Sequence, residues 1–172
     1  YTNMIYLSIL FSVFFFLLGL FASEPLARLL GAEQNVLQMT DTYLKWLLLF
    51  APAFILNDVF LCFVRNDEGP RLSMFAMLTG SLANIILDYV FIFPMGMGVF
   101  GAIFATGLSP VISIFIMSIR WVKKTNTFHF IKSKISGRIW GQGLALGFPS
   151  FVAQLSSGIV MITFNTIILG LE

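Results

Sequence analysis

Long apolar runs separated by short polar segments dominate this chain. The runs cover about residues 4–22, 44–64, 72–93, 99–122 and 144–170. A helix that crosses a bilayer needs about 20 mostly apolar residues, so each run is predicted to be a transmembrane helix. Strands of a membrane barrel alternate apolar and polar positions, and these runs do not alternate. The pattern therefore predicts an all-α polytopic membrane protein with five transmembrane helices in this chain.

The segments between the runs differ in charge. Residues 94–98 hold no charge, and residues 23–43 hold one arginine against Glu24, Glu33 and Asp41. Residues 65–71 hold two arginines, and residues 120–143 hold only basic charges: Arg120, Lys123, Lys124, Lys132, Lys134 and Arg138. Because cytoplasmic loops carry the excess of Lys and Arg, segments 65–71 and 120–143 are expected on the cytoplasmic side.

Two connecting segments carry further structure signals. Ser23-Glu24-Pro25 is typical of a helix start and predicts a short helix at the outer interface. Residues 128–140 mix aromatic and basic side chains. This mixture fits a segment that lies on the headgroups, but a basic linker whose charges only set the topology is the favoured interpretation.

Composition places the chain in the membrane class. Hydrophobic residues make up 58% of it and charged residues only 10%, where a soluble domain carries roughly a quarter. A single histidine and a single cysteine exclude a His/Cys metal cluster and a disulfide framework within the chain. No phosphate loop or nucleophile–base set is present, so neither an enzyme, a cofactor nor a nucleic-acid partner is expected. The chain does not begin with Met, and we expect it to be a piece of a longer protein.

Two aspartates, Asp58 and Asp88, fall inside the predicted spans. A central Asp costs about 2.5–3.5 kcal/mol on insertion scales, so such residues are rarely passive. Asn84 precedes Asp88 by one helical turn, which places two oxygen donors on one face. This pair suits Na⁺ or a proton. Alternatively, Asp88 lies near enough to Pro94 to reach headgroup water.

Thr106 is the matching residue on the next span. Pro110 has no N–H, so the Thr106 carbonyl loses its partner and is available together with the hydroxyl. The alternative is a proline kink with the hydroxyl bonded back to its own helix. The short 94–98 hairpin makes the two spans neighbours.

Other polar positions are candidates for a substrate cavity: Gln154, Ser157, Asn57 and Asp58. Amides and hydroxyls in spans more often join helices, and Asp58 could instead reach the cytoplasmic surface or pair with Arg65. No Lys or Arg lies deep in a predicted span. An acidic interior favours organic cations over anionic cargo as the transported substrate.

Four stretches then carry a family resemblance: residues 63–74 (FVRNDEGPRLSM), 84–93 (NIILDYVFIF), 96–107 (GMGVFGAIFATG) and 146–150 (LGFPS). In order and spacing they resemble the loop between helices four and five, helix five, and the starts of helices six and seven of multidrug and toxic compound extrusion (MATE) transporters. The resemblance implies part of a twelve-helix, two-lobe transporter. Residues 1–122 would be part of the N-terminal lobe, 123–143 a basic cytoplasmic linker, and 144–172 the first helix of the C-terminal lobe.

The resemblance also implies a cation site. Family members with a site in the N-terminal lobe use an Asn and an Asp on helix five, with a Thr hydroxyl and an Ala carbonyl on helix six. These match Asn84, Asp88, Thr106 and Ala102, while a further acid belongs to a first helix that this chain lacks. Ser157 stands where another branch of the family has an acid.

The resulting hypothesis is an antiporter that exports organic cations or drugs in exchange for Na⁺ or H⁺. We expect it to be a monomer in a bacterial-type inner membrane. A lipid-linked oligosaccharide flippase of related architecture and a non-transporting structural subunit are the alternatives.

Overall fold

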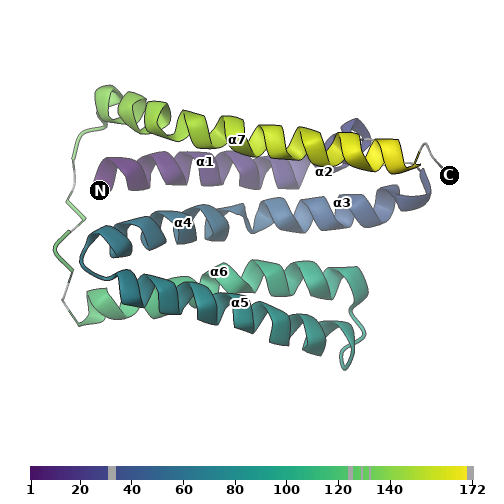
Figure 1. The fold of residues 1–172 in the computed structure, drawn as a ribbon, viewed down its shortest axis with the longest axis horizontal. Helices are drawn as coiled ribbons and strands as arrows, with labels where there is room; N and C mark the ends of the chain where they lie inside the picture. The colour runs from purple at the N-terminus through teal and green to yellow at the C-terminus, as the bar shows by residue number, and fades with distance from the viewer. Residues whose placement is uncertain (31–33, 124–125, 129, 132, 170–172) are drawn as a thin grey trace. The chain divides into compact units, whose positions relative to one another are not determined.

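The computed structural model describes residues 1–30, 34–123, 126–128, 130–131 and 133–169, and all regular elements among them are α-helices (Figure 1). Glu33, Lys124 and Lys132, which enter the charge argument, lie outside these residues. The chain forms two compact units, Tyr1–Ser133 and Lys134–Glu172. The first unit contains α1 to α6, and the second contains α7. The predicted all-α membrane fold is confirmed.

Within the described residues, four helices are long and apolar enough to cross a membrane, and one bent pair adds a fifth span. The four are α1 (Thr2–Phe21), α5 (Pro70–Ile92), α6 (Gly98–Val122) and α7 (Gly137–Leu169). The first three agree closely with the predicted ranges. Helix α7 begins earlier than residue 144, because the polar and glycine-rich residues 137–143 continue the helix although they lower its hydropathy.

The second span differs from its prediction. It consists of α3 (Gln34–Leu49) and α4 (Ala51–Asn66), bent by 44° at Phe50, and it starts well before residue 44. Pro52 in the first turn of α4 has no N–H to continue the helical bonding, which explains the break. Asp41 and Lys45 consequently lie within the helix. Asp41 therefore joins Asp58 and Asp88 as an acid within a candidate span, and the Lys45 side chain on the same helix is exposed.

The break between α3 and α4 is packed against α6. A Cβ on Gly107 would overlap the ring of Phe50, so only glycine allows this approach. Helix α1 packs on both α3 and α4, and α5 packs on α4 and α6. A buried cluster of Leu61, Val64, Ala76 and Met117 joins α4, α5 and α6. This cluster lies at the end of the unit where the basic segments 65–71 and 120–123 meet, here called the basic end.

Helices α5 and α6 form the antiparallel hairpin that the sequence predicted. Gly96 and Gly98 have φ values of 62° and 56°, a left-handed conformation that glycine adopts without strain. The predicted short helix is also present as α2 (Ser23–Leu29). Its Glu24 and Arg28 form an exposed ion pair at 2.8 Å. The described residues between α6 and α7 are not helical before Gly137.

Candidate functional site

Small residues and one interhelical hydrogen bond hold α5 close to α6. The Oγ of Ser109 donates to the carbonyl oxygen of Gly80 at 2.8 Å. A Cβ added to Gly80 would come within 3.2 Å of the Ser109 carbonyl oxygen. Near the hairpin, a Cβ added to Gly101 would come within 2.9 Å of the Phe91 Cβ. Glycine therefore sets how closely the two helices approach each other, both near the hairpin and in the middle of the pair.

These two contacts also set the register of the predicted cation ligands. Each residue advances about 1.5 Å along its helix, in opposite directions in an antiparallel pair. Counting along the helices from the two contacts places Asn84 at the level of Thr106 and Asp88 at the level of Ala102. The four predicted ligands thus occupy the same two turns of the α5–α6 pair.

Asn84 and Asp88 both have polar atoms that are buried without a partner. In the part of the chain that the structure describes, the Nδ2 of Asn84 and the Oδ1 of Asp88 lack a hydrogen bond. A buried polar atom without a partner costs about 1–3 kcal/mol, so most native polar atoms are paired. The Asp88 oxygen is an acceptor that a cation or a proton can satisfy, whereas the Asn84 Nδ2 is a donor and needs an acceptor. The atom of Asn84 that can face a cation is its Oδ1.

Thr106 shows the local bonding that was the alternative to a ligand role. Its Oγ1 donates to the carbonyl oxygen of Ala102 at 2.9 Å, within the same helix. A hydroxyl that donates its hydrogen still has lone pairs on the oxygen, which can face a cation. Pro110 lies inside α6 and leaves the Thr106 carbonyl without its helical donor. Thr106 therefore offers two oxygens although its hydroxyl is bonded.

Asn57 on α4 lies beside Gly80, which is one helical turn closer to the basic end than Asn84. It lines a cavity of about 130 Å³ between α4, α5 and α6, whose other lining residues are Phe54, Met77, Gly80, Ser81, Ser109, Pro110 and Ser113. Ser113 is 2% exposed. Its Oγ and the Oδ1 of Asn57 are buried without a hydrogen-bond partner among the described residues. Sequence reasoning missed Ser113, although its spacing of one turn from Ser109 was a usable signal.

Asp58 does not share the cavity of Asn57. It is an exposed residue on a groove of about 360 Å³ between α1 and α4, lined by Met4, Leu7, Ser8, Phe11, Ile55, Val59, Cys62 and Phe63. The groove is apolar apart from this carboxylate and Ser8. Among the described residues Asp58 forms no ion pair, so the expected partner Arg65 does not bind it.

Gln154 and Ser157 belong to the second unit. Both are exposed on α7, and Gln154 lines a shallow groove of about 290 Å³ on that helix. Asn57 and Asp58 belong to the first unit, so the two pairs of candidate residues are described separately. No group of three or more His, Cys, Asp or Glu side chains suited to a metal ion occurs in the described ranges.

Comparisons with known proteins agree with this geometry. A sequence model of the MatE family matches residues 1–90. The multidrug export protein MepA of Staphylococcus saprophyticus is 32% identical over 168 residues, which are 96% of this chain and 37% of that protein. MepA of Staphylococcus aureus is 29% identical over 163 residues, 94% of this chain and 36% of that protein.

A solved structure is also similar. It is described as the inward-facing conformation of a multidrug resistance MATE family transporter of the MOP superfamily. The TM-score is 0.80 with 34% sequence identity, over 91% of this chain and 36% of that chain. The chain therefore spans little more than a third of the length of the proteins that it matches.

Proposed function

This chain belongs to the MatE family of membrane transporters, and from that premise we propose that it forms part of a secondary antiporter. The full-length transporter that carries it exports organic cations across a bacterial inner membrane in exchange for Na⁺ or H⁺. Its relatives are multidrug export proteins and not enzymes, which supports export as the activity.

The coupling ion binds at Asp88, with Asn84, Thr106 and Ala102 as the neutral partners. The single observation that carries this assignment is the Oδ1 of Asp88, which is buried and has no hydrogen-bond partner among the described residues. The register of α5 and α6 adds the Thr106 and Ala102 oxygens at the same levels. Oxygen donors of this kind are what Na⁺ prefers, and a proton would neutralise the same carboxylate.

Binding at Asp88 drives transport by changing the energy of burying its charge. An ionised carboxylate away from water is strongly disfavoured unless it is paired. Bound Na⁺ or H⁺ neutralises the charge of Asp88. The conformation in which the site is closed to water then has a lower free energy. The ion therefore binds one conformation better than the other, which is the condition for coupling.

The exported substrate is an amphipathic organic cation. The cavity beside Asn57 and the groove beside Asp58 present amide, hydroxyl or carboxylate groups on largely apolar surfaces. None of the lining residues of either is basic. Such surfaces favour a flat or branched cation over an anionic lipid headgroup.

The test uses the full-length transporter in inverted vesicles, with uptake of the fluorescent cation ethidium driven by an imposed Na⁺ or pH gradient. Asp88→Asn should abolish gradient-driven uptake. Glu68→Gln is the matched control, since it removes one negative charge from an exposed side chain just beyond the end of α4, and it should leave gradient-driven uptake intact. Wild-type uptake by Asp88→Asn, at equal amounts of protein in the membrane, would show that Asp88 does not bind the coupling ion.

A further inference from the structure

A small cavity lies between α4, α5 and α6, next to the candidate cation site. Gly80 lines it and precedes Asn84 by four residues, or about 6 Å along α5. Pro110 lines it from α6. The carbonyl of a helical residue points toward the residue four positions later, so the carbonyl of Thr106 points from the cation site toward Pro110. The cavity therefore continues the site toward the basic end.

The most buried polar side chain of this cavity is Ser113, which is 2% exposed. The other three hydroxyls of α6 have an acceptor. Thr106 and Ser118 each donate to the carbonyl oxygen one turn earlier in α6, and Ser109 donates to α5 at 2.8 Å. The Oγ of Ser113 has no hydrogen-bond partner among the described residues. Its hydroxyl therefore needs a partner within the cavity.

Asn57 supplies a second such group from α4. Its Oδ1 is buried and also lacks a partner in the part of the chain that the structure describes. An amide oxygen only accepts hydrogen bonds, whereas a serine hydroxyl both donates and accepts. Buried polar atoms without a partner are strongly disfavoured, and native proteins satisfy them with protein groups or ordered water. Asn57 and Ser113 together suit a small molecule that both donates and accepts, as water does.

The size and charge of the cavity also fit water. Its volume is about 130 Å³, well below the roughly 300–1,000 Å³ of a pocket that encloses a drug-sized molecule. At most a small group of an exported cation fits inside. Water takes about 30 Å³ in the liquid, so there is room for more than one molecule. All lining residues are uncharged, so a cation passes this place and is held at Asp88 instead.

The three helices close beyond the cavity. The next turn of each helix toward the basic end contributes to the buried apolar cluster of Leu61, Val64, Ala76 and Met117. Ser81, by contrast, lines the cavity and is exposed. The open side of the cavity is therefore at Ser81, and the cluster closes it toward the basic end.

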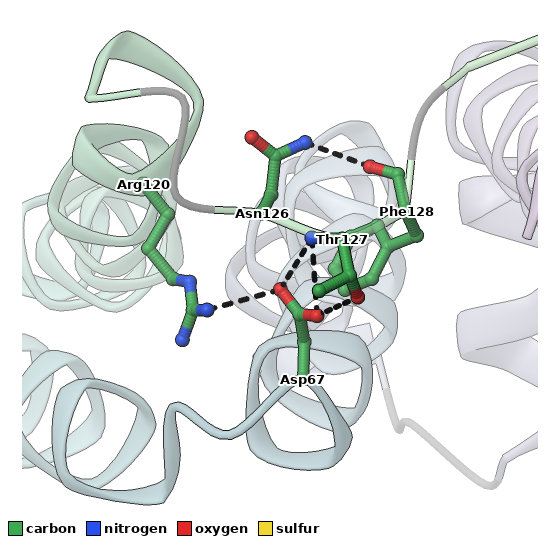
Figure 2. Close-up of polar contacts among 5 residues, drawn as sticks. All are labelled: Asp67, Arg120, Asn126, Thr127 and Phe128. Carbon is green, nitrogen blue, oxygen red and sulfur yellow. Dashed lines mark hydrogen bonds and ion pairs between the residues drawn. The ribbon is translucent and has the colours of Figure 1, made fainter.

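A buried ion pair fastens this closed end. Asp67 follows α4 and is 4% exposed, and its Oδ2 lies 3.1 Å from the Nη2 of Arg120 in the last turn of α6 (Figure 2). The backbone N–H of Thr127 donates to both carboxylate oxygens of Asp67 at 3.2 Å, and its hydroxyl donates to Oδ1 (Figure 2). A buried carboxylate is stable when donors surround it in this way. The ends of α4 and α6 are thus held together beyond the cluster.

We propose that the cavity holds water bonded to Asn57 and Ser113, and that the coupling ion exchanges between Asp88 and bulk water by way of this bound water. The water site stands on the cavity alone, whereas the ion route rests on the function proposed above. An ion that leaves Asp88 loses protein oxygens and must gain water oxygens, and water held beside Asn84 supplies them. Asn57 and Ser113 are therefore positioning residues, which set how fast the ion exchanges and leave its affinity for Asp88 unchanged.

Radiolytic hydroxyl labelling of the full-length transporter in lipid nanodiscs tests the water site without any measurement of transport. Brief X-ray irradiation converts water into hydroxyl radicals, which oxidise adjacent side chains. Phe54 lines the cavity and should be oxidised, whereas Met117 in the apolar cluster should not be, although methionine is easily oxidised. No oxidation of Phe54 beyond that of Met117 would show that the cavity is dry or filled by another part of the transporter, and the proposal would fail.

Ser113→Ala and Ser118→Ala form the matched pair for this measurement. Ser113→Ala removes a hydrogen bond to the bound water and should lower the oxidation of Phe54 at least about twofold. Ser118→Ala removes a hydroxyl of the same helix that is bonded to the Ile114 carbonyl oxygen at 2.8 Å, and it should leave the oxidation of Phe54 unchanged. Equal oxidation of Phe54 in Ser113→Ala and in wild type would contradict the water site.

The ion route predicts a change in rate without a change in affinity. Asn57→Leu keeps the approximate size of the side chain and removes its amide. The maximal rate of gradient-driven ethidium uptake should fall about tenfold, while the half-saturating ion concentration stays within about twofold of wild type. Asn66→Leu, at an exposed position in the last turn of the same helix, should leave both quantities unchanged. Ser113→Ala should act in the same direction as Asn57→Leu and replaces it if that variant does not fold.

The kinetic results separate the ion route from the other proposals. An unchanged maximal rate in both variants, at equal amounts of protein in the membrane, would overturn the ion route. A changed half-saturating ethidium concentration with an unchanged ion dependence would overturn it as well, because Asn57 would then contact the exported cation. Gradient coupling that survives in Asp88→Asn would refute the coupling site, while the labelling of Phe54 would still decide the water site.

Discussion

The hydroxyl of Ser109 donates a hydrogen bond of 2.8 Å to the carbonyl oxygen of Gly80, and this bond locks α6 against α5. Gly80 is buried, and the nearest atoms to an added Cβ would be the carbonyl oxygen and the Oγ of Ser109 at 3.2 and 3.3 Å and the Cβ of Ser113 at 3.4 Å. The relationship matters for function because Asn84 and Asp88 lie one and two turns farther along α5. A shift of α6 at Gly80 would move Thr106 and Ala102 away from them.

Substitution of Gly80 should therefore separate the two helices in proportion to the added volume. Gly80→Ala needs movements of only a few tenths of an ångström and should cost about 1 kcal/mol, whereas Gly80→Leu should cost about 3 kcal/mol or more. Thermal unfolding of the purified full-length transporter, followed by size-exclusion chromatography after heating, measures the difference. Gly80→Leu unfolding at the wild-type temperature would show that the close approach is not required.

A shift caused by Gly80 should also reach the cation site. Gly80→Ala, the mild variant, is expected to weaken coupling-ion binding by less than Asp88→Asn does while leaving the transporter folded. The half-saturating ion concentration for ethidium transport reports this effect. An unchanged value would mean that the position of α6 at Gly80 does not control the site.

Thr106 gives a sharper prediction, because its hydroxyl and its shape can be separated. Thr106→Val keeps the branched shape but loses the hydroxyl oxygen, and it should raise the half-saturating concentration of the coupling ion about tenfold, which corresponds to about 1.4 kcal/mol. Thr106→Ser keeps the oxygen and should remain close to wild type. Equal half-saturating concentrations for the two variants would show that the hydroxyl only bonds to Ala102 within α6 and does not bind the ion.

Pro110 is expected to act through the carbonyl of Thr106. Pro110→Ala restores a donor N–H to that carbonyl, so the carbonyl becomes bonded within α6 and less available to a cation. Thermal stability should be unchanged or higher, while the half-saturating ion concentration rises about threefold to tenfold, by about 0.7–1.4 kcal/mol. Higher stability with unchanged ion binding would show that the Thr106 carbonyl does not take part in binding the ion.

Much of the membrane fold was readable from hydropathy because long apolar runs have few alternatives in a bilayer. The same signal placed the start of the second span at residue 44, because Asp41 and Lys45 lower the hydropathy of α3 although helix packing continues through them. The bend at Phe50 depends on contact with Gly107, which is distant in sequence. The levels at which Thr106 and Ala102 face Asn84 and Asp88 likewise depend on the register of α5 and α6, which the short hairpin only implied.

Asp67 shows most clearly what sequence reasoning could not reach. It stands beside Glu68 and between two arginines, so its charge looked like one more loop charge. Its burial arises from Thr127, 60 residues away in the chain, and from Arg120 at the end of another helix. A basic linker likewise fits both a free tether and an attached segment until the positions of Tyr1, Phe63 and Trp121 around Phe128 are known.

The Asp67–Arg120 pair should contribute strongly to stability only as an intact pair. Asp67→Asn leaves the Arg120 charge in a mostly buried place, and removing one partner of a buried pair typically costs about 3–5 kcal/mol. Arg120→Gln leaves the carboxylate with only the Thr127 donors and should cost a similar amount. In the double variant neither charge is left buried without its partner. Its loss of stability should therefore be clearly smaller than the sum of the losses in the two single variants. Thermal unfolding of the four proteins measures the coupling, with Glu68→Gln as the control for net charge at the same bend. Strictly additive losses would mean that the two side chains act separately, and the buried pair would then not be what holds the end of α4 to the end of α6.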